Sequence, residues 1–202
     1  MKSEKTEDSA GDSESRAKDA KATIDKVIKK IIFFGEENLK NRKKIMTLAE
    51  KLYKCSDKLA EVLVELDHPG KSCAYLLFAK DKLFRDYVEL KNISKSNVKT
   101  CQENLEYYKE LHKDFTDFDK KSDSQRTALL NNLNDTLEIA FDNYKSSQEN
   151  LVFWQKDFED LQRDYRKNQI KLLRRQIAEY KRKLPAAEKK LSKLLEEQNK
   201  KS

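Results

Sequence analysis

The 202-residue sequence has little of what builds tight turns, since it contains three glycines and two prolines. Average usage would give roughly 24 residues of these two types in a chain of this length. Sandwiches, barrels and doubly wound sheets need many turns, and turns depend on Gly, Pro, Asn or Asp at special dihedral angles. The shortage disfavours these sheet-based folds and predicts an all-α protein made of a few long helices.

Cysteines and enzyme signatures are also scarce. Cys55, Cys73 and Cys101 are far apart and lack Cys-x-x-Cys spacing, which fits a reducing compartment better than a disulfide framework. His68 and His112 are distant in sequence, and no HExxH, GxxxxGK[ST] or GxSxG pattern occurs. We therefore expect no enzyme activity, no metal site and no cofactor.

Long apolar runs are missing as well. No run of 18 apolar residues occurs, so no membrane-spanning helix is expected. The first twenty residues have no apolar core of a secretory signal. Residues 1–20 contain no Leu, Ile, Val or aromatic residue, and we expect a disordered polar tail there. A cytoplasmic location follows as an expectation.

Apolar residues recur at alternating steps of three and four, which is the heptad spacing of coiled coils. The spacing predicts three helices, at about 21–66, 72–119 and 124–200, in one domain that spans 21–202. Ser122 or Ser124 is a candidate N-cap of the third helix, and Pro185 predicts a kink or break within it. The expected fold is an elongated antiparallel three-helix coiled-coil bundle.

The apolar stripe is widest near the start of the second predicted helix, where one neighbouring helix would not cover it. This excess predicts a homodimer. The predicted dimer interface consists of Leu76, Leu77, Phe78, Leu83, Phe84, Tyr87 and Val88.

Basic residues form a stripe beside the apolar positions of the second helix and continue into the following connection. This basic stripe consists of Lys95, Lys99, Lys109, Lys113, Lys120, Lys121 and Arg126. A linear array of lysines on a rigid helix suits an anionic lipid surface, at about 1 kcal/mol per lysine. A solvated flank of a coiled coil is the alternative interpretation, because lysine is common there too.

A second candidate membrane element lies at residues 22–34. Its apolar face consists of Ile24, Val27, Ile28, Ile31 and Ile32, and lysines lie off that face. A basic amphipathic helix of this kind can insert into a membrane interface. The same residues would serve equally well in a dimer core.

Three long antiparallel helices with a lysine-bearing turn resemble a BAR domain over residues 22–200. Asp164-Tyr165-Arg166 and Ile170–Leu173 are similar to the closing stretch of many BAR domains. His68-Pro69 and Leu77-Phe78-Ala79 resemble the ciliary BAR family that works with Chibby, and the sorting-nexin and arfaptin-like groups stay open. The acidic first half of the third helix departs from the basic arms of that superfamily.

The BAR resemblance implies a crescent-shaped homodimer that binds phosphoinositide or phosphatidylserine and senses or generates membrane curvature. It implies a peripheral location on intracellular membranes or the plasma membrane, in endocytosis, membrane trafficking or the cilium. A coiled-coil adaptor or tether that binds a helical protein partner without lipid is the alternative. No nucleic-acid partner is expected, because leucines interrupt the basic segment 161–202.

Overall fold

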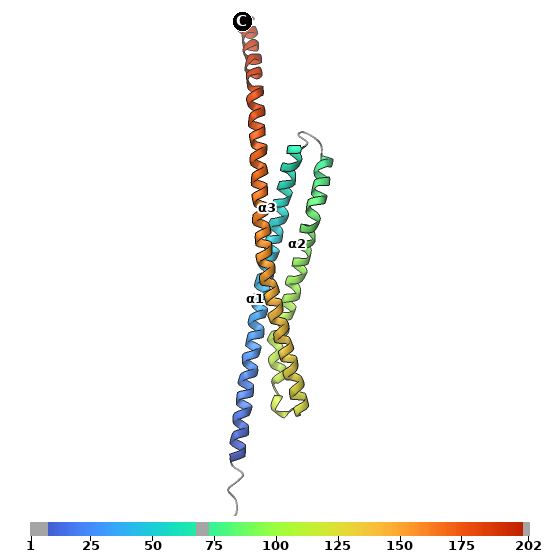
Figure 1. The fold of residues 1–202 in the computed structure, drawn as a ribbon, viewed down its shortest axis with the longest axis vertical. Coiled ribbons are helices and arrows are strands. Elements are labelled where there is room, and N and C mark those ends of the chain that lie inside the picture. The colour runs from blue at the N-terminus through green and yellow to red at the C-terminus, as the bar shows by residue number, and fades with distance from the viewer. Residues whose placement is uncertain (1–7, 68–72, 200–202) are drawn as a thin grey trace, which may run out of the picture. The chain divides into compact units, whose positions relative to one another are not determined.

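The computed structural model describes the backbone of residues 8–67 and 73–199, and the side chains of residues 19–67, 85 and 87–198. Three long helices account for almost all of it: α1 (Asp8–Asp67), α2 (Cys73–Glu110) and α3 (Asp123–Asn199) (Figure 1). Two short 3-10 helices, η1 (Leu111–Phe115) and η2 (Phe118–Lys120), lie between α2 and α3. No strand occurs in the described ranges, so the predicted all-α class is confirmed.

The end of α1 at Asp67 and the start of α2 at Cys73 lie close to their predicted positions, and the predicted connection at His68-Pro69-Gly70 lies outside the described residues. In contrast, α1 begins at Asp8 rather than at residue 21, so the predicted disordered tail is helical over residues 8–20. Ala, Glu, Lys and Arg in this stretch are good helix formers, and an established helix extends through them at little cost.

The second predicted helix ends early. Beyond Glu110 the chain tightens into η1 and η2 instead of continuing as an α-helix to residue 119. Thr and Asp residues at 114, 116 and 117 favour local turns over helix. Phe115 and Phe118 pack their rings together across the two 3-10 turns, with centroids 5.7 Å apart.

Ser122 caps α3 as predicted. Its hydroxyl accepts a hydrogen bond from the Gln125 backbone N–H at 3.3 Å, and its own N–H donates to Gln125 Oε1 at 3.0 Å. This reciprocal pair is a capping box. The predicted break at Pro185 is wrong, because α3 continues through it to Asn199. A proline removes one backbone donor, and the strong helix formers on both sides keep the remaining bonds.

Two compact units share the three helices. Unit 1 contains residues 1–49 and 90–155, and unit 2 contains residues 50–89 and 156–202. The core of unit 1 joins all three helices, because α1, α2, η1 and α3 each contribute buried side chains. These are Ile24, Ile28, Ile31, Tyr108, Leu111, Leu133 and Ala140.

Pairs of contacting residues give the helix directions within unit 1. Asp25 lies beside His112 and Asn38 beside Cys101, so α1 and α2 run in opposite directions. Gly35 lets them approach closely, since a Cβ there would lie 2.8 Å from Cδ2 of the buried Tyr108 ring.

Polar contacts also cross the core of unit 1. Asn38 Nδ2 donates to Cys101 Sγ at 3.3 Å, and Asn41 Nδ2 donates to Ser147 Oγ at 3.2 Å. Both asparagines are buried, and Oδ1 of Asn38 has no hydrogen-bond partner. Polar groups of this kind inside a helical core fix the register of the helices at some cost in stability.

Candidate anion-binding surfaces

The basic stripe predicted on α2 is exposed at its lysines, but most of them already have an acidic neighbour. Lys99 Nζ lies 3.7 Å from Glu103, Lys109 Nζ 3.3 Å from Glu106, and Lys113 Nζ 2.8 Å from Glu110. Exposed pairs of this kind contribute only about 0–1 kcal/mol to stability, yet they reduce the positive potential that an anion meets. Lys95 is exposed on the same helix.

The connection between α2 and α3 shows the same pairing. Lys120 Nζ lies 3.0 Å from Asp117, whereas Lys121 is half-buried. Arg126 Nη2 donates to the Asp119 carbonyl at 2.6 Å, and its guanidinium lies over the Phe118 ring, 5.9 Å from the centroid. These contacts give Arg126 a structural role in holding η2 against α3.

The apolar face of residues 22–34 lies inside unit 1. Ile24, Ile28 and Ile31 are at most 4% exposed, and Val27 and Ile32 pack against the same core. Because these side chains already contact α2 and α3, the face is not free to enter a lipid surface in this conformation. Phe33 is the exposed apolar residue of the segment, at 53%.

Most of the predicted dimer interface lies outside the described side chains, namely Leu76, Leu77, Phe78, Leu83 and Phe84. Of the remaining two residues, Tyr87 is half-buried and donates a hydrogen bond to Asp157 Oδ2 of α3 at 3.2 Å. Val88 is 43% exposed.

A stretch of largely unpaired positive charge lies on α1, where the sequence analysis placed no site. Residues 40–58, the α1 basic segment, carry seven cations and two acids, for a net charge of +5. Among the described residues only one of the seven cations is in an ion pair, Lys40 with Glu37 at 3.1 Å. Summing the charges over one face of the helix would have revealed this segment. The net charge of the whole range 21–70 is only +3, because acidic residues outside the segment offset part of its positive charge.

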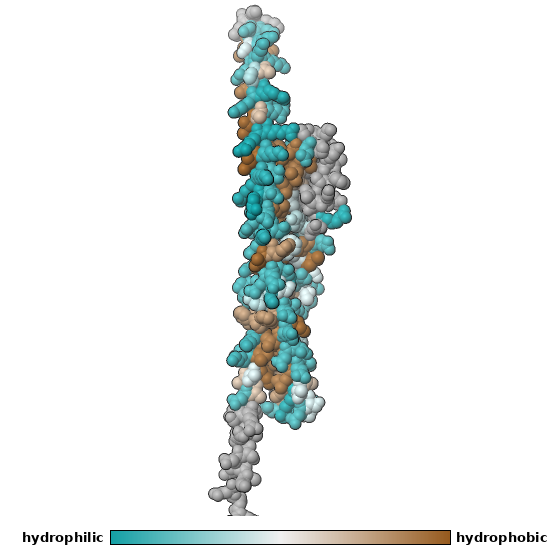
Figure 2. Space-filling model, in the orientation of Figure 1, coloured by the Kyte–Doolittle hydropathy of each residue, from teal (hydrophilic) through white to brown (hydrophobic). Residues whose placement is uncertain are grey.

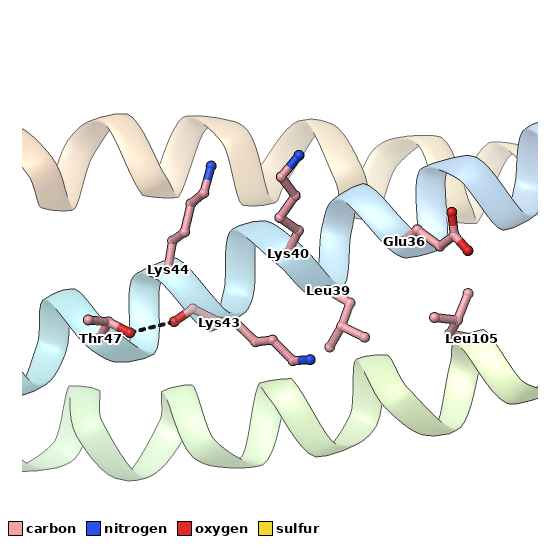
Figure 3. Close-up of a pocket in the computed structure, with 7 residues that line it drawn as sticks. All are labelled: Glu36, Leu39, Lys40, Lys43, Lys44, Thr47 and Leu105. Atoms are coloured by element: carbon pink, nitrogen blue, oxygen red, sulfur yellow. Dashed lines mark hydrogen bonds between the residues drawn. The ribbon is translucent and has the colours of Figure 1, made fainter.

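Part of the α1 basic segment lines an open groove of about 450 Å³ between α1 and α2 in unit 1. Figure 3 shows Lys40 and Lys44 pointing to the same side of α1, while Lys43 and Leu39 lie on the side of α2. Thr47 fixes the local backbone by donating to the Lys43 carbonyl at 3.1 Å. The groove is thus lined by three lysines and one carboxylate, that of Glu36, with Leu39 and Leu105 as its apolar part.

An uncovered apolar row runs along α3 and continues beyond the end of α1. Its members are alternately three and four residues apart, and all of their side chains are exposed. This α3 seam consists of Ile170, Leu173, Ile177, Tyr180, Leu184, Ala187, Leu191 and Leu194. Hydrophilic side chains cover most of the visible face of this part of α3 (Figure 2).

In the described helices, no stretch is long and apolar enough to cross a membrane. The described residues also contain no group of three His, Cys, Asp or Glu side chains arranged to hold a metal ion. Comparison with protein families, curated proteins and solved structures finds no match for this chain.

Proposed function

We propose that the chain is a peripheral membrane-binding protein that docks on anionic lipid as a helical homodimer and senses or generates curvature. The α1 basic segment carries this proposal, because six of its seven cations have no acidic partner among the described residues. Each lysine near an anionic surface contributes about 1 kcal/mol of attraction. The basic stripe adds less in this proposal, because Lys99, Lys109, Lys113 and Lys120 are paired.

The homodimer is the second part of the proposal. A heptad row such as the α3 seam buries its apolar side chains only when another helix lies along it. A second copy of the chain would supply that helix. The resemblance to BAR domains agrees with this arrangement and would add a crescent shape to the dimer.

The α3 seam also supports a second candidate function. A strict heptad row is narrower than the apolar face of helices that lie in a membrane interface, and it is typical of helix–helix contacts. A coiled-coil adaptor that binds a helical protein through the seam, with no lipid involved, would use the same residues.

Cosedimentation with vesicles separates these candidates. We expect the wild-type chain to pellet with phosphatidylserine vesicles and not with neutral phosphatidylcholine vesicles. Replacing Lys43 and Lys44 by Gln removes two unpaired charges and should weaken vesicle binding by about 2 kcal/mol, or roughly 30-fold. Replacing the paired Lys109 and Lys113 by Gln removes the same net charge and should cost less than about tenfold.

Pelleting of the wild-type chain with neither vesicle type rejects the membrane function and leaves the adaptor candidate. Equal pelleting with both vesicle types rejects the role of the α1 basic segment, because binding would then not depend on lipid charge. Equal losses in the two double variants mean that total charge matters and that the α1 basic segment is not the binding surface. Circular dichroism checks that both variants keep their helices.

A further inference from the structure

A second basic groove lies between α1 and α3, entirely within unit 2, and encloses about 380 Å³. We call it the α1–α3 groove. Four cations, two glutamines, one thiol and two aromatic rings line it. They are Lys51, Lys54, Lys58, Arg166, Gln162, Gln169, Tyr165, Cys55 and Phe158.

No carboxylate lines the α1–α3 groove, although acidic residues are common in the chain. Within the described part of the chain, none of its four cations is in an ion pair. Lys51, Lys54 and Lys58 step by three and four residues, so their ammonium groups share one helix face and repel one another. Lys109 on α2 and Lys113 on η1 differ from these lysines, because each is paired with a glutamate one turn away.

Repulsion on one face of a helix lowers stability and gives the isolated chain nothing in return. A bound anion of multiple charge would turn that repulsion into attraction for all four cations at once. Lys58 and Arg166 come from different helices, and both act on Cys55 at the groove. Burial raises the pKa of the Cys55 thiol, and the two cations oppose that rise.

The donors of the groove suit phosphate oxygens. The guanidinium of Arg166 offers a planar fork that matches two phosphate oxygens, and the lysines act as point charges. Gln162 and Gln169 add amide donors, and neither is hydrogen-bonded to another described side chain or backbone group. A volume of about 380 Å³ falls within the range of small-molecule sites.

We propose that the α1–α3 groove binds a multiply phosphorylated anion, held by Arg166 from α3 and by Lys51, Lys54 and Lys58 from α1. A phosphoinositide headgroup and a free inositol phosphate present the same chemistry. The inference rests on the proposed membrane function, to which the groove adds selectivity for polyphosphorylated lipid over phosphatidylserine.

Calorimetric titration of the full chain with soluble inositol trisphosphate tests the groove without any membrane. We expect saturable binding at one site per chain that weakens as salt is added. Replacing Lys54 and Lys58 by Gln should weaken it at least about tenfold, since hydrogen bonds to charged groups are the strong ones. Replacing Lys43 and Lys44 by Gln removes the same charge from the same helix outside this groove and should change the affinity by less than about threefold.

Vesicles then distinguish the source of the phosphate. With phosphatidylinositol bisphosphate vesicles, the Lys54/Lys58 variant should lose the preference over phosphatidylserine vesicles of equal charge. Its phosphatidylserine binding should fall only by the roughly 30-fold that the loss of any two lysines of the α1 basic segment produces. Soluble binding without any vesicle binding would assign the groove to a free phosphate and reject the membrane function.

The proposed phosphate site is rejected if wild type does not bind inositol trisphosphate, or if the Lys54/Lys58 variant binds it with the same affinity as wild type. This holds even if the chain still binds phosphatidylserine vesicles. A loss of the same size in the Lys43/Lys44 control also overturns it, because the effect would then follow net charge alone. Replacing Arg166 by Lys keeps the charge and removes the fork, and it should weaken trisphosphate binding measurably.

Discussion

Substitution within the α3 seam should dissociate the proposed homodimer into monomers. A fully buried Leu or Ile stabilises by about 1.5–3 kcal/mol relative to an exposed one. Ile177 and Leu184 are 54% and 57% exposed, so a covering helix would bury roughly half of each and contribute about 1 kcal/mol per side chain. Replacing both by Ser removes four such contributions from a dimer, or about 4 kcal/mol, which raises the Kd about a thousandfold.

Sedimentation equilibrium of the full chain measures this change. We expect the wild-type chain to sediment at twice its own mass at micromolar concentration and the Ile177→Ser/Leu184→Ser variant at its own mass. Serine leaves the net charge unaltered, so the result reports packing and not electrostatics. Ile139 and Val152 are 56% and 66% exposed elsewhere on α3, and replacing both by Ser provides the matched control.

The control should dimerise like the wild-type chain, because Ile139 and Val152 lie outside the seam. A wild-type chain that stays monomeric refutes homodimerisation and leaves the seam to a different helical protein. Equal dissociation constants for wild type and the seam variant would show that the dimer, if present, uses another surface, such as the predicted interface at Leu76–Val88.

Three further predictions concern stability and are measured by urea unfolding. Replacing Gly35 by Val should destabilise the chain by about 2 kcal/mol, because its Cβ would lie within 3 Å of the buried Tyr108 ring; unchanged stability would mean that the ring moves freely. Replacing Asn38 by Leu should stabilise it by about 1 kcal/mol, because Oδ1 is buried without a partner and the sulfur of Cys101 is a weak acceptor; a loss of stability would contradict this. Replacing Arg126 by Gln should destabilise the chain by about 1 kcal/mol, because the hydrogen bond to the Asp119 carbonyl is lost, and should leave vesicle binding almost unchanged. Unchanged stability together with weaker vesicle binding would show that Arg126 contacts lipid.

The helical fold was predictable because its signals are local. Heptad spacing predicted the three helices, and Pro69 with Gly70 predicted that the first helix would end near Asp67. The start of α1 at Asp8 was not predictable from apolar spacing, since residues 8–20 contain no Leu, Ile, Val or aromatic residue that could show such spacing. The change to 3-10 turns after Glu110 escaped the pattern for a different reason, because apolar residues three apart, such as Phe115 and Phe118, fit either helix type.

The candidate sites were less predictable because they depend on neighbours from other helices. Spacing placed Lys109 and Lys113 on one line correctly, and both are exposed. The spacing did not predict that these two lysines would form ion pairs with Glu106 and Glu110, because each glutamate has more than one lysine within reach. The α1–α3 groove depends on which residues of α3 face α1, and a single sequence carries little information about that register.

The end of α1 lies beside α3 at Arg175, within the stretch of the α3 seam. Arg175 Nη1 donates to the Leu66 carbonyl at 2.6 Å, which places a cation of α3 at the negative C-terminal end of α1. Up to this point α3 residues such as Tyr165 line a groove against α1. Beyond it the heptad row continues to Leu194, and within the described ranges no helix covers it. Because α3 keeps its apolar spacing after α1 has stopped, we propose that a helix of a second copy packs along this part of the row. This proposal makes the oligomeric state the first property to measure.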